Sequence, residues 1–210
     1  MKAKHEFDMV HGAQEVFRLF LEALANPGRI LSLGQCAARF RENGLWLAPA
    51  LTLLDNETGF YWRGPDETGE EIRFLTGAVP ASPEKADFLF LSAPASGLEA
   101  ADILSRAKAG SPENPHDSAL ILAAVPGEGS RSLPSGAFPR KETLGALLRG
   151  PGVPPEGRRI DLCPAEAAWL RAREAQGFEY PCGVELVFIR EDLSFMAITR
   201  KAEVTWPTQR

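Results

Sequence analysis

Two kinds of apolar segment alternate along the chain, and this alternation restricts the fold more than any other sequence feature. Three segments have apolar residues at helical spacing, and most of the others are short apolar runs typical of buried strands. Helix and strand patterns alternate in the first half, whereas the second half is rich in strands. This order predicts a three-layer α/β sandwich with a mixed sheet.

Helix boundary signals accompany the three clear helical patterns. HGAQEVFRLFLEALANPGRI is amphipathic and contains a Pro-Gly pair that ends the helix. In SGLEAADILSRAKAG, Ser96 is the expected N-cap, Glu99 completes a capping box and Gly110 follows the end. PAEAAWLRAREAQG has proline at its start and glycine beyond its end. LWLAPALTLL, residues 45–54, is apolar nearly all round, which favours a short buried helix, with a strand as the alternative.

The remaining apolar stretches are predicted as strands of one domain spanning residues 1–210. They are GRILSLG, residues 58–62, ADFLFLS, SALILAAV, TLGALLRGPGV, GRRIDL, GVELVFIR and SFMAITR. EEIRFLTGAVP combines a helical turn with a Thr-Gly exit, and the Pro/Gly-rich stretches 111–115 and 126–139 are expected to be surface loops. A length of 210 residues suits a single domain of this kind.

The stretch LLDNETGFYW contains two acidic residues beside three aromatic ones, and two interpretations are open. Asp55 and Glu57 could form the acid pair of an active site, or Asp55-Asn56 could form the turn between a buried element and a strand. A catalytic pair needs a partner, and no histidine or second acidic motif lies nearby in the sequence. We therefore predict a turn.

Composition excludes several classes of protein. The net charge of −5 argues against broad binding of nucleic acid or anionic membrane, because both need clustered positive charge. No apolar run is long enough to span a membrane, and the N-terminus lacks the apolar core of a signal peptide, so we expect a cytoplasmic protein. Three widely spaced cysteines, Cys36, Cys163 and Cys182, indicate neither a disulfide framework nor a zinc site.

The motifs of self-sufficient enzymes are missing from the sequence. The histidines His5, His11 and His116 have no metal or triad spacing, so no metal site is predicted. Phosphate-loop, dinucleotide-binding and GxSxG motifs do not occur. Lys85, Lys108 and Lys201 do not stand in the setting of a Schiff base. Catalytic residues therefore stay unassigned.

Arginines at the ends of elements are the remaining candidates for binding an anion. The guanidinium group matches the geometry of phosphate and carboxylate, and a glycine turn lets backbone amides approach an anion. The candidate residues are Arg73 with Thr76, Arg149 before Gly-Pro-Gly, and Arg200 after SFMAIT. The alternative for each arginine is an ion pair that only supports the fold.

An interface is also considered for the aromatic residues Phe60, Tyr61, Trp62 and Phe74, although core packing is the commoner role of such a set. Because the edge strands of an open sheet can pair with another chain, a homodimer of the isolated protein is expected.

Eight sequence blocks, taken in order, resemble one family. They are VFRLFLEALANPG, LTLLDNETGFYW, IRFLTGA, ADFLF, ALIL, LRGPGV, FEYPCGVELVF and AITRKAEV, and together they span roughly residues 11–204. The blocks resemble PhnH, a subunit of the bacterial carbon–phosphorus lyase system. The chain departs from the family pattern at Glu185, where the family has aspartate, and around Arg200-Lys201.

The resemblance implies a fold similar to that of pyridoxal-phosphate transferases without the cofactor lysine, and no covalently bound cofactor. It also implies a subunit, inactive by itself, of the carbon–phosphorus lyase core complex. That complex displaces adenine from its substrate MgATP with a phosphonate, giving ribose 1-phosphonate 5-triphosphate, and other core subunits would be the partners. A stand-alone nucleotide-binding transferase and a purely architectural dimerising module are the alternatives.

Overall fold

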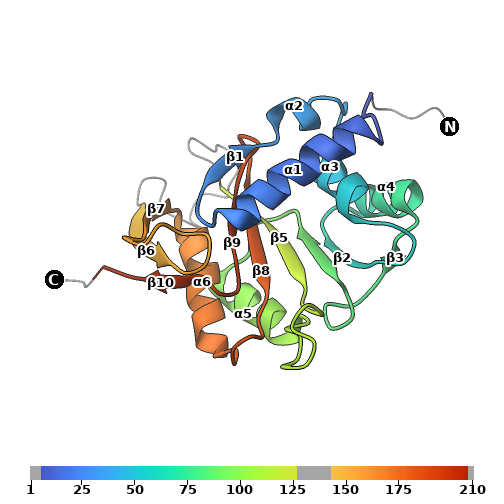
Figure 1. Cartoon of the computed structure of the whole chain (residues 1–210). Coiled ribbons are helices and arrows are strands. Elements are labelled where there is room, and N and C mark those ends of the chain that lie inside the picture. Colours follow the sequence, from blue (N-terminus) through green and yellow to red (C-terminus); the bar gives the residue numbers. More distant parts are fainter. Residues whose placement is uncertain (1–5, 127–142, 208–210) are drawn as a thin grey trace.

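Two β-sheets and six helices make up the protein in the computed structural model, which describes residues 6–126 and 143–207 (Figure 1). The main sheet has seven strands in the order β1-β9-β8-β5-β4-β2-β3, and a second sheet has the order β10-β6-β7. The strands are β1 (Ile30–Ser32), β2 (Gly59–Arg63), β3 (Val79–Pro80), β4 (Phe88–Leu91), β5 (Leu120–Val125), β6 (Leu144–Arg149), β7 (Arg158–Leu162), β8 (Glu185–Arg190), β9 (Ser194–Ile198) and β10 (Glu203–Thr205). The helices are α1 (His11–Ala25), α2 (Gly34–Ala37), α3 (Gly44–Leu53), α4 (Asp66–Thr76), α5 (Gly97–Arg106) and α6 (Pro164–Gln176).

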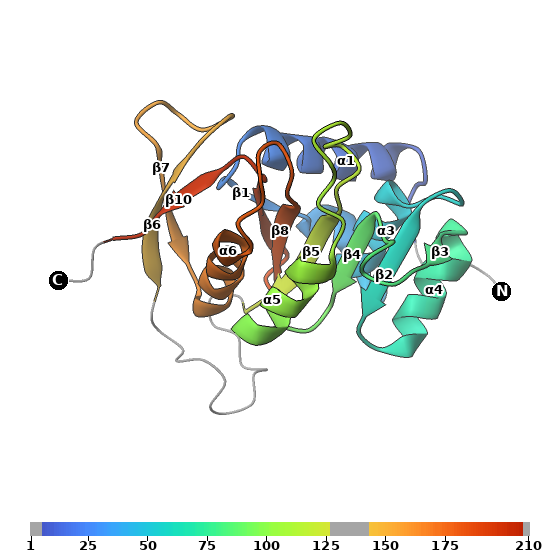
Figure 2. The same ribbon diagram turned by 90° about the horizontal axis from the view of Figure 1, so that it is seen from below.

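The main sheet is mixed, as the sequence predicts. Strands β3, β2, β4, β5 and β8 run parallel, β9 is antiparallel to β8, and β1 is antiparallel to β9. Figure 2 shows the sheet between α1 on one side and α5 and α6 on the other. The prediction of a mixed α/β fold with helices against a mixed sheet is therefore confirmed.

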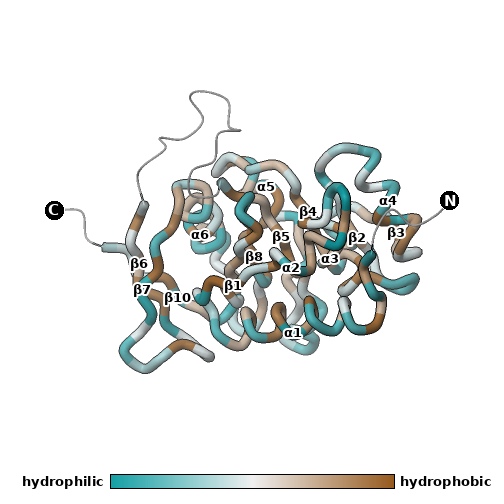
Figure 3. The backbone as a smooth tube through the Cα atoms, turned by 90° about the horizontal axis from the view of Figure 1, so that it is seen from above, coloured by the Kyte–Doolittle hydropathy of each residue, from teal (hydrophilic) through white to brown (hydrophobic). Residues whose placement is uncertain are grey.

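The central strands explain why SALILAAV and GVELVFIR are apolar at successive positions. Ile121 and Phe188 face the core beneath α5 and α6, whereas Leu122 and Val187 face the core beneath α1 and α3. A strand buried on both faces needs apolar side chains in both directions. In Figure 3 the tube through β5 and β8 is accordingly brown along much of its length.

The second sheet is the main departure from the expected strand arrangement. The segments TLGALLRGPGV and GRRIDL form the β6–β7 hairpin, which pairs with β10 and not with the main sheet. The sequence did not predict β10. Arg200 and Lys201, which were expected to follow the last strand, therefore lie in the loop between β9 and β10. Leu148 and Ile160 of this sheet join the core on the α6 side.

The helix predictions are confirmed, although α5 ends at Arg106, before the expected stop at Gly110, and α4 is longer than predicted. The segment 45–54 is helical up to Leu53, with Trp46 to Leu51 buried. The capping box of α5 forms as expected, because Ser96 and Glu99 bond reciprocally at 3.3 and 2.8 Å. EEIRFLTGAVP, in contrast, contains the second half of an eleven-residue helix that begins at Asp66. Among the described residues, no helix combines the length and apolarity needed to span a membrane.

The acidic stretch after α3 is a turn, as predicted. The Asp55 carboxylate accepts hydrogen bonds from the backbone N–H groups of Glu57 and Thr58, both at 3.0 Å. This Asx-type arrangement reverses the chain into β2. The Ser111–Pro115 loop lies at the surface, also as predicted. Of the predicted loop 126–139, only Pro126 belongs to the described residues.

The aromatic set divides between core and surface. Phe60 is buried, Tyr61 and Trp62 are half-buried, and Phe74 is 72% exposed. Core packing therefore accounts for Phe60, whereas Phe74 remains available for contact with another molecule.

Candidate functional site

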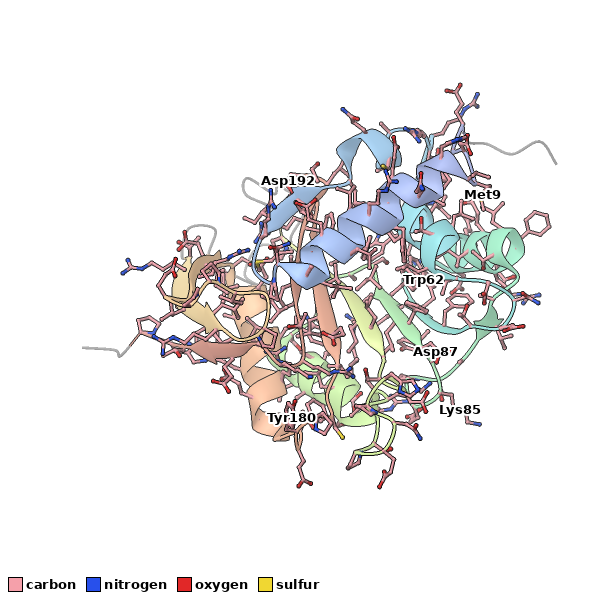
Figure 4. The ribbon with its side chains drawn as sticks, viewed as in Figure 1. Met9, Trp62, Lys85, Asp87, Tyr180 and Asp192 are labelled. Atoms are coloured by element: carbon pink, nitrogen blue, oxygen red, sulfur yellow. The ribbon has the colours of Figure 1, made fainter. Side chains whose placement is uncertain are left out.

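Four chain segments that are distant in sequence meet beside the amino ends of β5 and β8. They are residues 108–119, 177–184, 199–202 and 150–152. In Figure 4, Lys85 and Asp87 before β4 and Tyr180 before β8 mark this edge of the sheet, whereas Asp192 lies at the opposite edge. The polar side chains gathered between β5, β8 and β9 form the candidate site.

Arg200 is held at the centre of this site by three residues from two segments. Its Nη1 donates hydrogen bonds to the Pro115 carbonyl oxygen and, at 2.7 Å, to Oγ of Ser118. Its Nε lies 3.4 Å from Oε1 of Glu185. The backbone N–H of Arg200 also donates to Oε2 of Glu185 at 2.8 Å, so one carboxylate fixes both the backbone and the side chain of Arg200.

Glu185 occupies an environment that disfavours its charge. Burial raises the pKa of the Glu185 carboxyl above its ordinary value, because a charged group loses hydration when it is buried. The hydrogen bond from the Arg200 backbone and the positive charges of Arg200, Arg173 and Lys201 counteract this effect without cancelling it. A carboxyl group with a raised pKa beside several cations is a feature of many functional sites.

Arg173, in the last turn of α6, is the second arginine of the site. Only 7% of the residue is exposed. Its Nη1 and Nη2 donate to the carbonyl oxygens of Thr199 and Ala202 at 2.9 and 2.8 Å. The side chain thus holds the turn that carries Arg200, and burial lowers the pKa of the Arg173 guanidinium.

Two cavities flank Arg200. The larger has a volume of about 330 Å³, and its lining includes Arg173, Phe178, Cys182, Arg200 and Glu203. The smaller has a volume of about 270 Å³, and its lining includes Ala25, Pro151, Gly152, Glu185 and Lys201. Arg200 is therefore the residue that the two cavities share.

The Gly-Pro-Gly turn forms a closely packed wall of the smaller cavity. A Cβ atom at Gly152 would overlap the carbonyl oxygen of Ala25, and the φ of Gly152 is +78°. A Cβ atom at Gly150 would lie 2.7 Å from the carbonyl oxygen of Lys201. Glycine is therefore required here so that the turn can approach the end of α1 and the loop after β9.

The four sequence-predicted anion-binding residues fall into two groups in space. Arg200 lies inside the site, and Arg149 is exposed at the end of β6, directly before the wall of the smaller cavity. Arg73 and Thr76 lie on α4, near the far end of the strand order. Arg73 is exposed and 3.5 Å from Glu70, while the Thr76 hydroxyl donates to the Ile72 carbonyl at the helix end. These residues do not form one site together.

Sequence reasoning missed Arg173 and assigned no role to Glu185. The signal for Arg173 is its position four residues after Trp169, on the stripe of α6 that faces the core. An arginine on such a stripe is buried and must find internal partners. Glu185 gave no comparable signal, because its surroundings come from loops that are remote in sequence.

Two of the three cysteines and both described histidines are poorly placed for catalysis. Burial raises the pKa of the Cys163 thiol to about 12 and also raises the pKa of Cys36, so neither is a ready nucleophile. His11 lies at the surface, 3.0 Å from Asp8, and His116 is exposed. Within residues 6–126 and 143–207, no three His, Cys, Asp or Glu side chains are grouped to hold a metal ion.

Comparison with known proteins identifies the family. A search of curated proteins found no match. The model of one protein family, described as bacterial phosphonate metabolism protein (PhnH), matches residues 5–205. This match includes every segment of the candidate site and nearly the whole chain. The chain therefore belongs to the PhnH family of bacterial phosphonate metabolism proteins.

Proposed function

We propose that the protein is a non-autonomous, cytoplasmic subunit of the carbon–phosphorus lyase core complex. In this role it supports the displacement of adenine from MgATP by a phosphonate, which gives ribose 1-phosphonate 5-triphosphate. The observation that carries the proposal is the match to the PhnH family over residues 5–205. Other core subunits are the proposed partners.

The reaction brings two highly charged anions together. A phosphonate oxygen attacks the ribose carbon that holds adenine, and adenine leaves. Mg²⁺ and arginine side chains would offset the repulsion between the triphosphate and the phosphonate, which is large where water is excluded. The proposed contribution of this subunit is to place such cations beside groups supplied by its partners.

The positions of Arg149 and Arg200 support this contribution. Arg149 is exposed, and Arg200 lines both cavities beside the Gly-Pro-Gly turn. Arg73 and Thr76 remain a separate candidate on α4, where the exposed guanidinium could meet an anion at a subunit boundary. The described lysines support a function without a covalently bound cofactor. Lys108 pairs with Asp87 at 2.6 Å, and Lys85 and Lys201 are exposed.

An apolar row on α1 supports the proposal of partner subunits. Val10, Phe17 and Leu21 lie on one side of the helix and are 71%, 47% and 50% exposed. Met9 before the helix and Ile30 on the edge strand β1 are also more than half exposed. Several exposed large apolar side chains along one helix are typical of a surface that contacts another protein. The same row favours the second candidate function, an architectural module that forms a homodimer.

Reconstitution tests the proposed function. The chain should co-purify with the other core subunits, and omission of the chain should abolish formation of the ribose 1-phosphonate product from MgATP and a phosphonate. The isolated chain should give no product. Solo turnover would favour a stand-alone transferase, and repeated failure to co-purify would contradict the proposal.

Surface variants separate the candidate functions. The double variant Phe17→Asp/Leu21→Asp should abolish co-purification if α1 meets a partner, whereas Leu98→Asp, at an 87% exposed apolar position on α5, should not. Arg149→Ala should leave assembly intact and reduce turnover. An architectural module would retain full turnover after the same change.

A further inference from the structure

We propose that the larger cavity, beside the last turn of α6, binds a tetrahedral oxyanion such as a phosphate or phosphonate group through Arg173 and Arg200. The inference goes beyond the proposed function, because it concerns a ligand of the isolated chain. It can fail while the chain still assembles with partners, and it can hold if assembly fails.

Arg173 carries a buried charge that the described part of the protein leaves incompletely compensated. No ion pair among the described residues involves Arg173. A guanidinium has five N–H donors, and here two of them reach backbone carbonyls. Glu185 and Glu174 favour the charged form of Arg173 without an ion-pair contact, and burial still lowers its pKa, so a bound anion would stabilise this arrangement.

The free donors of Arg173 are not sealed inside the protein. Its Nε has no hydrogen-bond partner among the described residues. Trp169 Nε1 is the only fully buried side-chain nitrogen or oxygen without a partner in that part of the chain, so Arg173 Nε must be accessible. The same reasoning applies to Nη2 of Arg200. Both residues line the same cavity, which is why we assign one ligand to both.

The carboxylates around the cavity leave these donors available. Glu185 accepts from the Arg200 backbone and lines the other cavity. Both oxygens of Glu174 accept from Trp206 Nε1, at 3.2 and 2.9 Å. Glu203 is exposed at the rim, where water screens its charge. The cavity lining therefore includes two arginines, Arg173 and Arg200, together with Glu174 and Glu203.

Geometry and size indicate the class of ligand. The planar fork of a guanidinium matches two oxygens of a phosphate or phosphonate group. A volume of about 330 Å³ admits such a group together with a substituent. The group could be a free phosphonate or phosphate, or it could belong to a nucleotide. The probes of the experiment distinguish these sources.

Titration of the isolated protein with inorganic phosphate, methylphosphonate and ATP tests the inference. Calorimetry at constant ionic strength should show saturable binding, and Arg173→Gln should weaken it by about tenfold or more, since a charge-assisted hydrogen bond is lost. Arg171→Gln, an exposed arginine on the same helix, should bind like the wild type. Binding of phosphate and methylphosphonate indicates a free anion, and binding of ATP alone indicates a nucleotide.

A second measurement needs only the wild-type protein, and it tests for oxyanion binding in the larger cavity even if Arg173→Gln does not fold. Cys182 lines the cavity, whereas Cys36 is buried and the pKa of Cys163 is about 12, so a thiol reagent should modify Cys182 first. A bound oxyanion should produce a saturable loss of the alkylation rate of Cys182, which sodium chloride at equal ionic strength should not reproduce. Absence of saturable binding together with an unchanged alkylation rate would overturn the inference.

Discussion

The two ends of strand β8 each carry an arginine–carboxylate pair, and the two pairs differ in their surroundings. At the carboxyl end, Arg190 donates from Nε and Nη2 to Oε1 of Glu166, at 3.0 and 2.7 Å. The Glu166 side chain is fully buried and that of Arg190 is 12% exposed. At the amino end, Arg200 and Glu185 are 3.4 Å apart, and a cavity adjoins each of them.

The difference in burial indicates different roles for the two pairs. The Arg190–Glu166 pair supports the fold, whereas the Arg200–Glu185 pair remains available to a ligand. Glu166 also accepts from the Cys163 backbone at the start of α6, so its carboxylate is satisfied by the helix and by Arg190. Glu185 faces Arg200 with poorer geometry, and Arg173 acts on Glu185 electrostatically without forming an ion pair. A site that binds an anion needs cationic side chains that still have hydrogen-bond donors free for the ligand.

The largest effect is expected at the carboxyl end. Glu166→Ala should lower the free energy of unfolding by about 3 kcal/mol or more, because it leaves the Arg190 cation buried without its partner. Glu99→Ala provides the control. Glu99 has the same capping-box position in α5 but is largely exposed, so its loss should cost about 1 kcal/mol or less. Denaturant unfolding measures both. Equal losses in the two variants would show that the buried Arg190–Glu166 pair contributes no stability beyond that of the capping box.

The wall of the smaller cavity should give the next largest effect. Gly152→Ala should destabilise the protein by about 2 kcal/mol or more, because its Cβ overlaps the Ala25 carbonyl at positive φ. Gly177→Ala also has positive φ, at +61°, but its Cβ meets nothing within 4 Å, so it should cost only about 1 kcal/mol. Thermal unfolding compares the two variants. Similar losses of stability in the two variants would indicate that the Gly-Pro-Gly turn can shift away from Ala25 without a cost in free energy.

The smallest effect is a change in pH dependence at the amino end. The folded protein holds the Glu185 proton more tightly than the unfolded chain does, since the pKa of Glu185 is raised on folding. The stability from this group is therefore fully present below the unfolded pKa and is lost as the pH rises through the folded pKa. Glu185→Gln should remove that loss and be nearly neutral or slightly stabilising at pH 7. Unfolding measured between pH 4 and about 7 tests this.

The exposed acid Glu203 provides the control for Glu185. Glu203→Gln removes the same charge from the rim of the larger cavity and should leave the pH dependence of unfolding close to that of the wild type. If Glu185→Gln also left the profile unchanged, the carboxylate at the amino end of β8 would be as well satisfied as Glu166.

The sequence predicts the elements of the fold better than it predicts the site. Apolar periodicity and caps determine α1, α5 and α6 locally, and all three form, although α5 ends at Arg106, before the expected stop at Gly110. The Asx turn at Asp55 depends on neighbouring residues and was predicted for the same reason. β10 is only three residues long, and it becomes a strand because β6 offers an edge for pairing. Because this strand depends on pairing with a distant segment, its own sequence carries no strand pattern.

The site depends on contacts between segments far apart in the chain. Arg200 was found because it ends an apolar run, but its contacts to Pro115 and Glu185 depend on the strand order. Arg173 appears in the sequence as one of several charges on a helix, and only the packing of α6 shows that it is buried. Arg73 and Arg149 were both predicted as arginines near the end of an element and close to a glycine. The fold nevertheless places only Arg149 beside the site.

The pairing of β10 with β6 has a consequence for the order of assembly during folding. The walls around Arg200 come from residues near positions 25, 151, 183 and 202, and the last of these lies directly before β10. The main sheet contains neither β10 nor β6, so it can form while the second sheet is still open. The pocket around Arg200 is complete only once both sheets have formed, and ligand binding would therefore report that the two sheets have come together.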